Sequence, residues 1–427
     1  MIVRNTRPWP AEPRRVVVTG MGLVTSLGVG VAKAWDGLVA GRSGVRTIEA
    51  FDPSRVDAKV AGEVRDFDAS NVLDRKEIRR TDRYIQFGLV ATREAMDQAG
   101  LPERFEGEEA ERTGVILGTG LGGTGTLVDG ISINATRGPD RISPFFIPMG
   151  IPNVGAGQIA INYGMVGPNF TTVSACATGG HAIGEAWETI RRNDADMMIA
   201  GGSEAGIYEP FVGGFDSMRA LSRRNDDPPG ASRPFDRGRD GFVVGEGCGV
   251  LVLEELEHAR ARGATILAEL IGYGATADAS HITLPAPGGI GAVRAARRAI
   301  AKAAIDPGEI AHVNAHATST PMGDEAELQA IRTLLGDHAP AASITANKSM
   351  LGHTLGAAGA IEAIVTIQTI RESCVPPTIN LEDPDDEIGD LDVVTKQARA
   401  QDVPVALSNS FGFGGQNTAL IFRRWEA

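Results

Sequence analysis

The stretch Val173-Ser174-Ala175-Cys176-Ala177-Thr178-Gly179-Gly180 marks a change of secondary structure, because an apolar, β-rich run from Phe170 to Val173 gives way there to small residues. Beyond it, apolar residues recur at helical spacing, at Ala182, Ile183, Ala186, Trp187 and Ile190. Cys176 is therefore predicted at or just before the N-terminus of a buried helix. Backbone N–H groups and the positive end of a helix dipole favour the thiolate, which is the nucleophilic form of cysteine. A buried, unreactive cysteine is the alternative, since free cysteine is among the most buried residue types.

Composition limits the classes of protein to consider. The chain has 427 residues, of which 42% are hydrophobic, and is long enough for two domains or one large duplicated one. Three cysteines make no disulfide framework, so we expect a cytoplasmic protein, with a mature organellar form as the alternative. No run of about 18 apolar residues occurs, and Met1 to Arg15 lacks a signal-peptide core, so neither membrane spanning nor secretion is expected. The net charge of −13 argues against general nucleic-acid binding.

Strand and helix patterns alternate along the chain. Predicted strands or strand ends are Arg15–Gly22, Gly114–Leu117, Asp196–Ala200, Ile266–Ile271 and His312–Asn314, and predicted helices include Val31–Leu38, Ala292–Ala304 and Asp324–Leu334. Gly241 to Leu253 is predicted to form a β-hairpin in which Cys248 is structural. The alternation begins again near Ala264, so we expect two similar α/β halves, although no repeat is visible as sequence identity.

Three short motifs carry little weight. Gly118–Gly123 fits the dinucleotide fingerprint G-x-G-x-x-G, but the region about 20 residues later reads as a loop and not as a strand with an acidic end. Gly201–Ala205 nearly spells the G-x-S-x-G nucleophile elbow but ends in alanine. His312 and His316 have the spacing of metal ligands on a helix, but in a strand residues i and i+4 lie about 13 Å apart. No metal is expected.

Two histidines occupy turns like that of Cys176. His316 stands in a polar loop between a strand and the acidic helix Asp324–Leu334. His353 lies between a strand at Ser343–Ala346 and a helix that continues to about Ile370. One cysteine and two histidines, each at a strand-to-helix turn, together favour a site for nucleophilic catalysis.

With these motifs the sequence resembles the β-ketoacyl-acyl-carrier-protein synthases, and among them the type II elongating enzymes (synthase II) of fatty-acid synthesis. The resemblance runs from about Arg15 to the C-terminus and is carried by four motifs: Ser174-Ala175-Cys176-Ala177-Thr178-Gly179, Asn314-Ala315-His316-Ala317-Thr318-Ser319-Thr320, Lys348 with Gly352-His353, and Asn409-Ser410-Phe411-Gly412-Phe413-Gly414-Gly415. It implies an α/β protein of the thiolase fold, with two duplicated βαβ-rich halves in five α-β-α-β-α layers and a homodimeric assembly. The halves are expected at residues 14–264 and 265–427.

The resemblance also implies residue roles. Cys176 would be the nucleophile that takes the acyl chain as a thioester. His316 and His353 would bind the malonyl thioester carbonyl and promote its decarboxylation, and Lys348, partnered by Glu362, would hold the electrostatics of the site. The backbone N–H groups of Cys176 and Phe413 would form the oxyanion hole. The substrate-binding residues would be Thr318 and Thr320 on the phosphopantetheine arm and Leu121, Phe146, Phe215, Phe411 and Phe413 around the acyl chain, with no cofactor and no metal.

The implied partner is acyl carrier protein, which is acidic in this family. We expect it to dock on basic residues of this acidic chain, at Lys76, Arg79, Arg80, Arg141 and Arg224. The alternative for the first cluster is an ordinary solvated helix face.

The chain departs from the family pattern at a few positions. Ala317 stands where many members have glycine, Gln416 replaces a residue that is commonly threonine or histidine, and the N-terminal dozen residues match no motif. Two other functions stay open, a type II polyketide ketosynthase and a nonenzymatic acyl-binding protein. The first would require a partner subunit without the cysteine, and the intact Cys176, His316, Lys348 and His353 argue against the second.

Overall fold

The computed structural model describes residues 12–426. Residues 1–11, which make up nearly all of the N-terminal dozen and most of the segment considered as a signal peptide, lie outside this range. A twelve-stranded sheet runs through the molecule in the order β14-β12-β11-β16-β17-β10-β1-β9-β7-β5-β6, with β2 paired to β1. Two small sheets, β13-β15 and β3-β4-β8, flank it.

The large sheet consists of two similar halves. The first half contains β1 (Val16–Thr25), α3 (Arg83–Ala99), β5 (Thr113–Gly118), α7 (Val154–Tyr163), β6 (Asn169–Phe170), α8 (Thr178–Arg191), β7 (Met197–Glu204) and β9 (Gly247–Glu255). The second contains β10 (Ala268–Ala277), α11 (Ile290–Ala303), β11 (His312–Asn314), α12 (Pro321–Leu335), β12 (Ser343–Thr345), α14 (Ala358–Glu372), β16 (Val405–Gly412) and β17 (Gln416–Arg423). The strand order β6-β5-β7-β9-β1 recurs as β12-β11-β16-β17-β10, and β1 joins β10 in a short antiparallel ladder.

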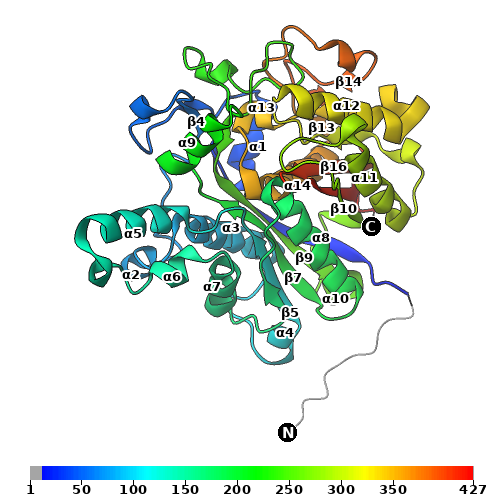
Figure 1. The fold of residues 1–427 in the computed structure, drawn as a ribbon. Helices are drawn as coiled ribbons and strands as arrows, with labels where there is room; N and C mark the ends of the chain where they lie inside the picture. Colours follow the sequence, from blue (N-terminus) through cyan, green and yellow to red (C-terminus); the bar gives the residue numbers. More distant parts are fainter. Residues whose placement is uncertain (1–11, 427) are drawn as a thin grey trace.

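Helices complete five layers. α8 and α14 pack between the two halves of the sheet and against each other, α3 and α7 cover the outer face of the first half, and α11 and α12 cover that of the second (Figure 1). The predicted fold class, with duplicated halves in an α-β-α-β-α arrangement, is confirmed. The turns that directly precede α8 and α14, Ala175–Ala177 and Leu355–Ala357, contact each other, and the first also contacts β16.

Local sequence explains where these helices lie. Residues 358–370 of α14 are all buried, and a helix that is apolar or small on every side belongs in the interior of a layered protein. α3 has a polar face as well, which suits an outer layer. It begins at the N-cap Asp82, whose side chain accepts from the backbone N–H of Tyr84, and ends at Gly100 in the left-handed conformation.

Most predicted elements are present, but the hairpin at Gly241–Leu253 is wrong. β8 (Val244–Gly245) pairs in parallel with β4 (Val60–Gly62), and β9 pairs antiparallel with both β1 and β7. β9 is a central strand, almost wholly buried, and its partners lie far away in the sequence. Two short apolar runs separated by glycines are locally typical of a hairpin. Which strands pair, however, depends on which side chains are buried between the layers. Cys248 is fully buried there, as expected of a structural residue.

The other elements connect these layers. They are β2 (Gly28–Val29), α1 (Val31–Val39), β3 (Arg46–Thr47), α2 (Arg75–Ile78), α4 (Gly107–Glu111), α5 (Thr124–Arg137), α6 (Phe146–Gly150), α9 (Glu209–Ser217), α10 (Leu256–Ala261), α13 (Lys348–Leu351), β13 (Cys374–Val375), β14 (Asp392–Val393) and β15 (Arg399–Ala400). Within residues 12–426 no helix has the length and apolar character needed to cross a membrane.

Candidate active site

Cys176 lies in a single 3-10 turn, Ala175–Ala177, directly before α8, as the sequence predicts. The turn is strained, because Ala175 has a φ of 48°, which residues with a Cβ rarely adopt. Thr178 helps to hold it, since its Oγ1 accepts a hydrogen bond of 2.8 Å from the backbone N–H of Ser174. On the other side, the ring of His181 lies 2.8 Å from the Ser174 hydroxyl. The nucleophile is therefore presented by a rigid turn.

The thiol of Cys176 does not have the lowered pKa that its position before a helix suggested. Burial raises the pKa of Cys176 to about 12, although the positive charge of Lys348 and the backbone N–H of Phe413 act in the opposite direction. Desolvation disfavours the charged form of a cysteine, and here it outweighs the helix dipole. Burial therefore works against the thiolate that a helix end favours, and the nucleophile has to lose a proton for the attack.

His316 and His353 meet beside the cysteine. His316 follows β11 and His353 follows α13, and their ring centroids lie 5.3 Å apart, edge to face. Burial, together with the positive charge of Lys348, holds the pKa of each imidazole well below its usual value. Both rings are therefore neutral, and each can donate one ring N–H to a substrate oxygen.

Lys348 contacts the backbone of His316 and pairs with Glu362, the partner that the resemblance implies. Its Nζ donates to the backbone carbonyl of His316 at 2.6 Å and to the carboxylate of Glu362. Both side chains are 3% exposed. A buried charge of this kind is stable only when it is paired, so the two residues form a unit that fixes the His316 loop and keeps its ring uncharged.

Glu327 on α12 is a site residue that was missed in the sequence. Its carboxylate accepts from the backbone N–H groups of His316 at 2.9 Å and Ala317 at 2.7 Å, and from the side-chain amide of Asn409 at 3.1 Å. A signal for it exists, because Glu327 shares the buried face of α12 with Asp324 and Ile331 at helical spacing. An acidic residue on an otherwise buried face indicates a specific set of donors.

The hairpin turn between β16 and β17 closes over Cys176. A Cβ at Gly412 would lie 2.7 Å from the carbonyl oxygen of Ser174 and 3.2 Å from the backbone nitrogen of Cys176, so this close approach requires glycine. The backbone N–H of Phe413 points at the thiol. The turn thus brings the backbone N–H of Phe413 next to the sulfur and packs Gly412 against the backbone of Cys176.

These groups open into one cavity of about 720 Å³. Its walls include the predicted site residues Leu121, Cys176, Phe215, His316, Thr318, Thr320, His353, Phe411 and Phe413. Phe146 is placed elsewhere: it packs in α6 against Gly130 of α5. Phe242, which was not predicted, stacks edge to face on His353 at 5.4 Å. The cavity has an apolar part suited to an alkyl chain and a polar wall at the hydroxyls of Thr318 and Thr320, which lie 3.0 Å apart.

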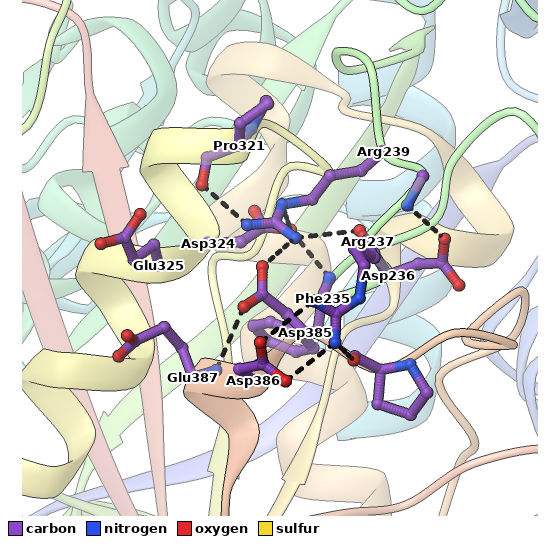
Figure 2. A network of polar contacts seen from close by, with 12 residues as sticks. Phe235, Asp236, Arg237, Arg239, Pro321, Asp324, Glu325, Asp385, Asp386 and Glu387 are labelled. Atoms are coloured by element: carbon purple, nitrogen blue, oxygen red, sulfur yellow. Dashed lines mark hydrogen bonds and ion pairs between the residues drawn. The ribbon is translucent and has the colours of Figure 1, made fainter.

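A buried arginine anchors the loop that carries the two threonines (Figure 2). Arg239 donates to the carbonyl of Pro321 at 2.8 Å and to Asp385 at 2.6 Å. Asp324 accepts from the backbone N–H groups of Ser319 and Phe235, at 3.1 and 2.9 Å. The start of α12 and the polar cavity wall are therefore tied to the segment around residue 385.

The discounted motifs have structural roles here. Ser203 is fully buried within β7 and donates to the carbonyl of Tyr84 at 2.6 Å. His312 lies on β11 beside the Ser343 hydroxyl, 2.9 Å away. In residues 12–426 no group of three or more His, Cys, Asp or Glu side chains is arranged to hold a metal ion.

The basic residues considered for docking lie in three segments of the chain. Lys76, Arg79 and Arg80 are exposed on or just after α2, and the guanidinium of Arg80 stacks 4.6 Å from the ring of Phe145, beside α6. Arg141 is exposed near its neighbour Asp140. Arg224 is half-buried after α9 and donates to the carbonyl of Gly238 at 3.2 Å.

Comparisons with known proteins cover nearly the whole chain. Family models described as beta-ketoacyl synthase, N-terminal and C-terminal domains, match residues 13–259 and 267–382. The chain is 50% identical over 415 residues to a 3-oxoacyl-[acyl-carrier-protein] synthase 2 of Synechocystis, covering 97% of this chain and 99% of that one. It is 48% identical to the protein of the same name from Coxiella burnetii, with the same coverage.

Solved structures are similar over the same extent. A beta-ketoacyl synthase from Burkholderia phymatum superposes with a TM-score of 0.89 at 38% identity, covering 97% of this chain and 100% of that one. A type II polyketide ketosynthase in complex with its acyl-carrier protein superposes with a TM-score of 0.88 at 35% identity and the same coverage.

Proposed function

The chain belongs to the β-ketoacyl synthase family, and we propose that it condenses an acyl group held on Cys176 with malonyl-acyl carrier protein, which yields 3-oxoacyl-acyl carrier protein and CO₂ in fatty-acid chain elongation. The observation that carries this proposal is the convergence of Cys176, His316 and His353 on one cavity. The chain is thus an acyltransferase of the condensing type.

In the first half-reaction, the sulfur of Cys176 attacks the carbonyl of an acyl-carrier thioester. The carbonyl oxygen gains negative charge and accepts from the N–H groups of Cys176 and Phe413. The carrier's sulfur then leaves and takes up a proton, so that the proton lost by Cys176 balances the one gained by the free carrier thiol. The neutral imidazoles beside the cysteine are the groups available to relay it.

In the second half-reaction, the malonyl thioester enters with its carbonyl oxygen between the two histidines. Loss of CO₂ leaves an enolate, which the ring N–H groups of His316 and His353 stabilise. The carbanion carbon attacks the thioester carbonyl on Cys176 and the carbon–sulfur bond breaks. The departing thiolate takes up one proton from solvent, which restores the thiol. The negative charge moves from carboxylate to enolate beside neutral imidazole donors, which is why the proposed chemistry assigns no step to a metal or a cofactor.

A ladder of acyl-carrier thioesters tests this function. We expect a mass increase on Cys176 equal to each transferred acyl group, followed by 3-oxoacyl-carrier product when malonyl-carrier is added. Intact-protein and peptide mass spectrometry locate the adduct. Acylation of another residue, or an adduct on Cys176 that malonyl-carrier does not consume, would contradict the proposal.

A type II polyketide ketosynthase is the second candidate, because the chain superposes on such an enzyme with a TM-score of 0.88. The curated relatives at 46–50% identity are synthases named for 3-oxoacyl-carrier products, whereas the polyketide structures share 35% identity. Activity of the chain without a different partner subunit separates the two functions in favour of fatty-acid elongation.

We place a homodimer interface at the edge strand β6. β6 ends the large sheet, and an edge strand presents unpaired backbone groups to a partner. Large apolar side chains on and beside it are exposed: Val166 by 67%, Phe170 by 42% and Val173 by 55%. Monomeric soluble proteins rarely expose such a group, and a second copy would pair the edge and cover the side chains. Ile131 and Ile161 are exposed in the same half.

Charges on this edge should separate the protomers. The double variant Phe170→Asp/Val173→Asp is expected to sediment as one chain where the wild type sediments as two, because buried unpaired carboxylates would be costly in the interface. Val29→Asp, on β2, is the matched control and should remain dimeric. Analytical ultracentrifugation measures both. A dimeric double variant would place the interface elsewhere.

We propose that acyl carrier protein docks on Lys76, Arg79, Arg80, Arg141 and Arg224. The chain carries a net charge of −13, so local positive potential is needed to bring an acidic partner close. The exposure of Lys76 and Arg79 supports this role, while Arg80 also packs on Phe145.

Reversing Arg79 and Arg80 to Glu should raise KM for carrier-bound substrates and leave KM for small pantetheine thioesters unchanged. Each exposed ion pair contributes only about 0.2–1 kcal/mol, so the double variant is informative where single ones are not. Arg79→Gln/Arg80→Gln is the matched control, because it removes charge without reversing it and should give an intermediate KM. Equal damage to both substrate types would show that the cluster supports the fold instead.

We also propose that the two halves divide at residues 14–264 and 265–427. The repeated strand order supports this division, as do the separate family models that end at 259 and begin at 267. A cytoplasmic location is proposed as well, with the three free cysteines, Cys176, Cys248 and Cys374, as its support.

A further inference from the structure

Glu204, at the end of β7, is a fully buried carboxylate that the reaction described above does not use. Its Oε1 accepts from the Thr119 hydroxyl at 3.0 Å and from the backbone N–H of Leu121 at 3.1 Å. Its Oε2 accepts from the backbone N–H groups of Gly120 at 2.7 Å and Gly356 at 3.0 Å. No lysine, arginine or histidine within residues 12–426 forms an ion pair with it.

The four donors to the two carboxyl oxygens of Glu204 indicate its protonation state. A protonated carboxyl, or the amide of glutamine, would direct its own hydrogen at an N–H group, so the arrangement requires the carboxylate. The anion carries a cost, because burial raises the pKa of Glu204 to about 7 and its charge contributes to the raised pKa of the Cys176 thiol. The negative charge of Glu204 disfavours ionisation of the Cys176 thiol, so we look for its role in the backbone segments that it binds.

The carboxylate joins two walls of the cavity, one from each half of the chain. Gly120 and Leu121 line the cavity from the loop after β5, and Leu355, directly before Gly356, lines it from the turn before α14. The two backbones nearly touch there, since a Cβ at Gly356 would lie 2.3 Å from the nitrogen of Gly120. Leu121 is partly buried, and a Cβ at Gly206 would lie 3.1 Å from one of its methyl groups, so the backbone at Gly206 packs closely against this side chain.

We propose that Glu204 is a positioning residue that locks Leu121 and Leu355 into the cavity wall and thereby determines which acyl chain lengths the enzyme accepts. This inference rests on the proposed function, in which the cavity holds the acyl chain. Backbone donors gathered on one buried anion form a rigid unit, and without the anion they would be left unsatisfied and would move apart. The cavity wall at Leu121 and Leu355 would then move apart far enough to accept longer acyl chains.

The test compares acyl-chain selectivity between variants of the full chain. In Glu204→Gln, the kcat/KM ratio of a sixteen-carbon to a six-carbon acyl-carrier substrate should rise at least about fivefold over wild type, mainly through KM. Thr119→Val removes one donor and should shift the ratio in the same direction but less, whereas Thr119→Ser keeps the hydroxyl and should restore the wild-type ratio. The thermal midpoint of each variant is measured alongside.

The chain-length profiles of these variants distinguish a positioning role of Glu204 from a general structural role. A uniform loss at all chain lengths in a folded Glu204→Gln variant would overturn the inference, because a general structural role predicts no change in selectivity. If that variant fails to fold, identical chain-length profiles for Thr119→Val and Thr119→Ser would overturn it equally. Wild-type protein that acquires no acyl group on Cys176 would instead refute the proposed function.

Discussion

Replacing Cys176 with Gln is expected to abolish condensation, by at least about 10³-fold, while malonyl decarboxylation continues at or above the wild-type rate. No acyl-enzyme can form without the sulfur. The uncharged amide resembles an acylated cysteine in size and polarity, and both histidines remain in place to bind the malonyl carbonyl. The variant therefore separates the two half-reactions.

Release of CO₂ from malonyl-carrier and formation of the 3-oxoacyl product, measured in parallel, check this result. Cys374→Ser is the matched control, because Cys374 lies on β13, outside the cavity lining, and both rates should be unchanged. Loss of decarboxylation together with condensation would mean that Cys176 acts in the second half-reaction as well, a role that the present mechanism does not contain.

Replacing His316 or His353 with Ala is expected to lower decarboxylation by about 10²–10³-fold while Cys176 can still be acylated. Each imidazole is neutral, since burial and Lys348 hold its pKa well below the usual value, and therefore donates an N–H to the enolate oxygen. Acylation depends on the oxyanion hole at Cys176 and Phe413, which neither substitution removes. Because the thiol rests protonated, acylation should be slower but still complete.

Single-turnover acylation followed by mass spectrometry, with CO₂ release measured separately, distinguishes the two steps. His338→Ala is the control, because His338 is exposed beyond α12, and both steps should proceed at wild-type rates. If neither active-site variant can be acylated, both histidines are indispensable for removing the proton of Cys176, and no other route serves the first half-reaction.

Local sequence patterns predicted where the candidate site residues Cys176, His316 and His353 lie in the fold. The change from β-rich to helical spacing around Cys176 and the polar turn at His316 mark strand-to-helix junctions that the structure contains. His353 also lies between β12 and α14, but the short helix α13 intervenes between the strand and this histidine. Such junctions depend on residues adjacent in the chain, so periodicity and small residues suffice to find them. The alternation along the chain likewise predicted two α/β halves.

Properties that depend on distant neighbours were decided only by the tertiary structure. The predicted hairpin at Gly241–Leu253 was wrong because β9 pairs with β1 and β7. The pKa of the Cys176 thiol is raised, and not lowered as a helix end would favour, because burial between the layers has the larger effect. Helical spacing shows that Glu327 lies on a buried face, but its donors come from the His316 loop and from β16, which only the fold brings together. The donors to Glu204 come from both halves of the chain, so no local pattern could reveal them. Secondary structure follows from short-range sequence, whereas burial, pairing and charge environment follow from which chain segments meet.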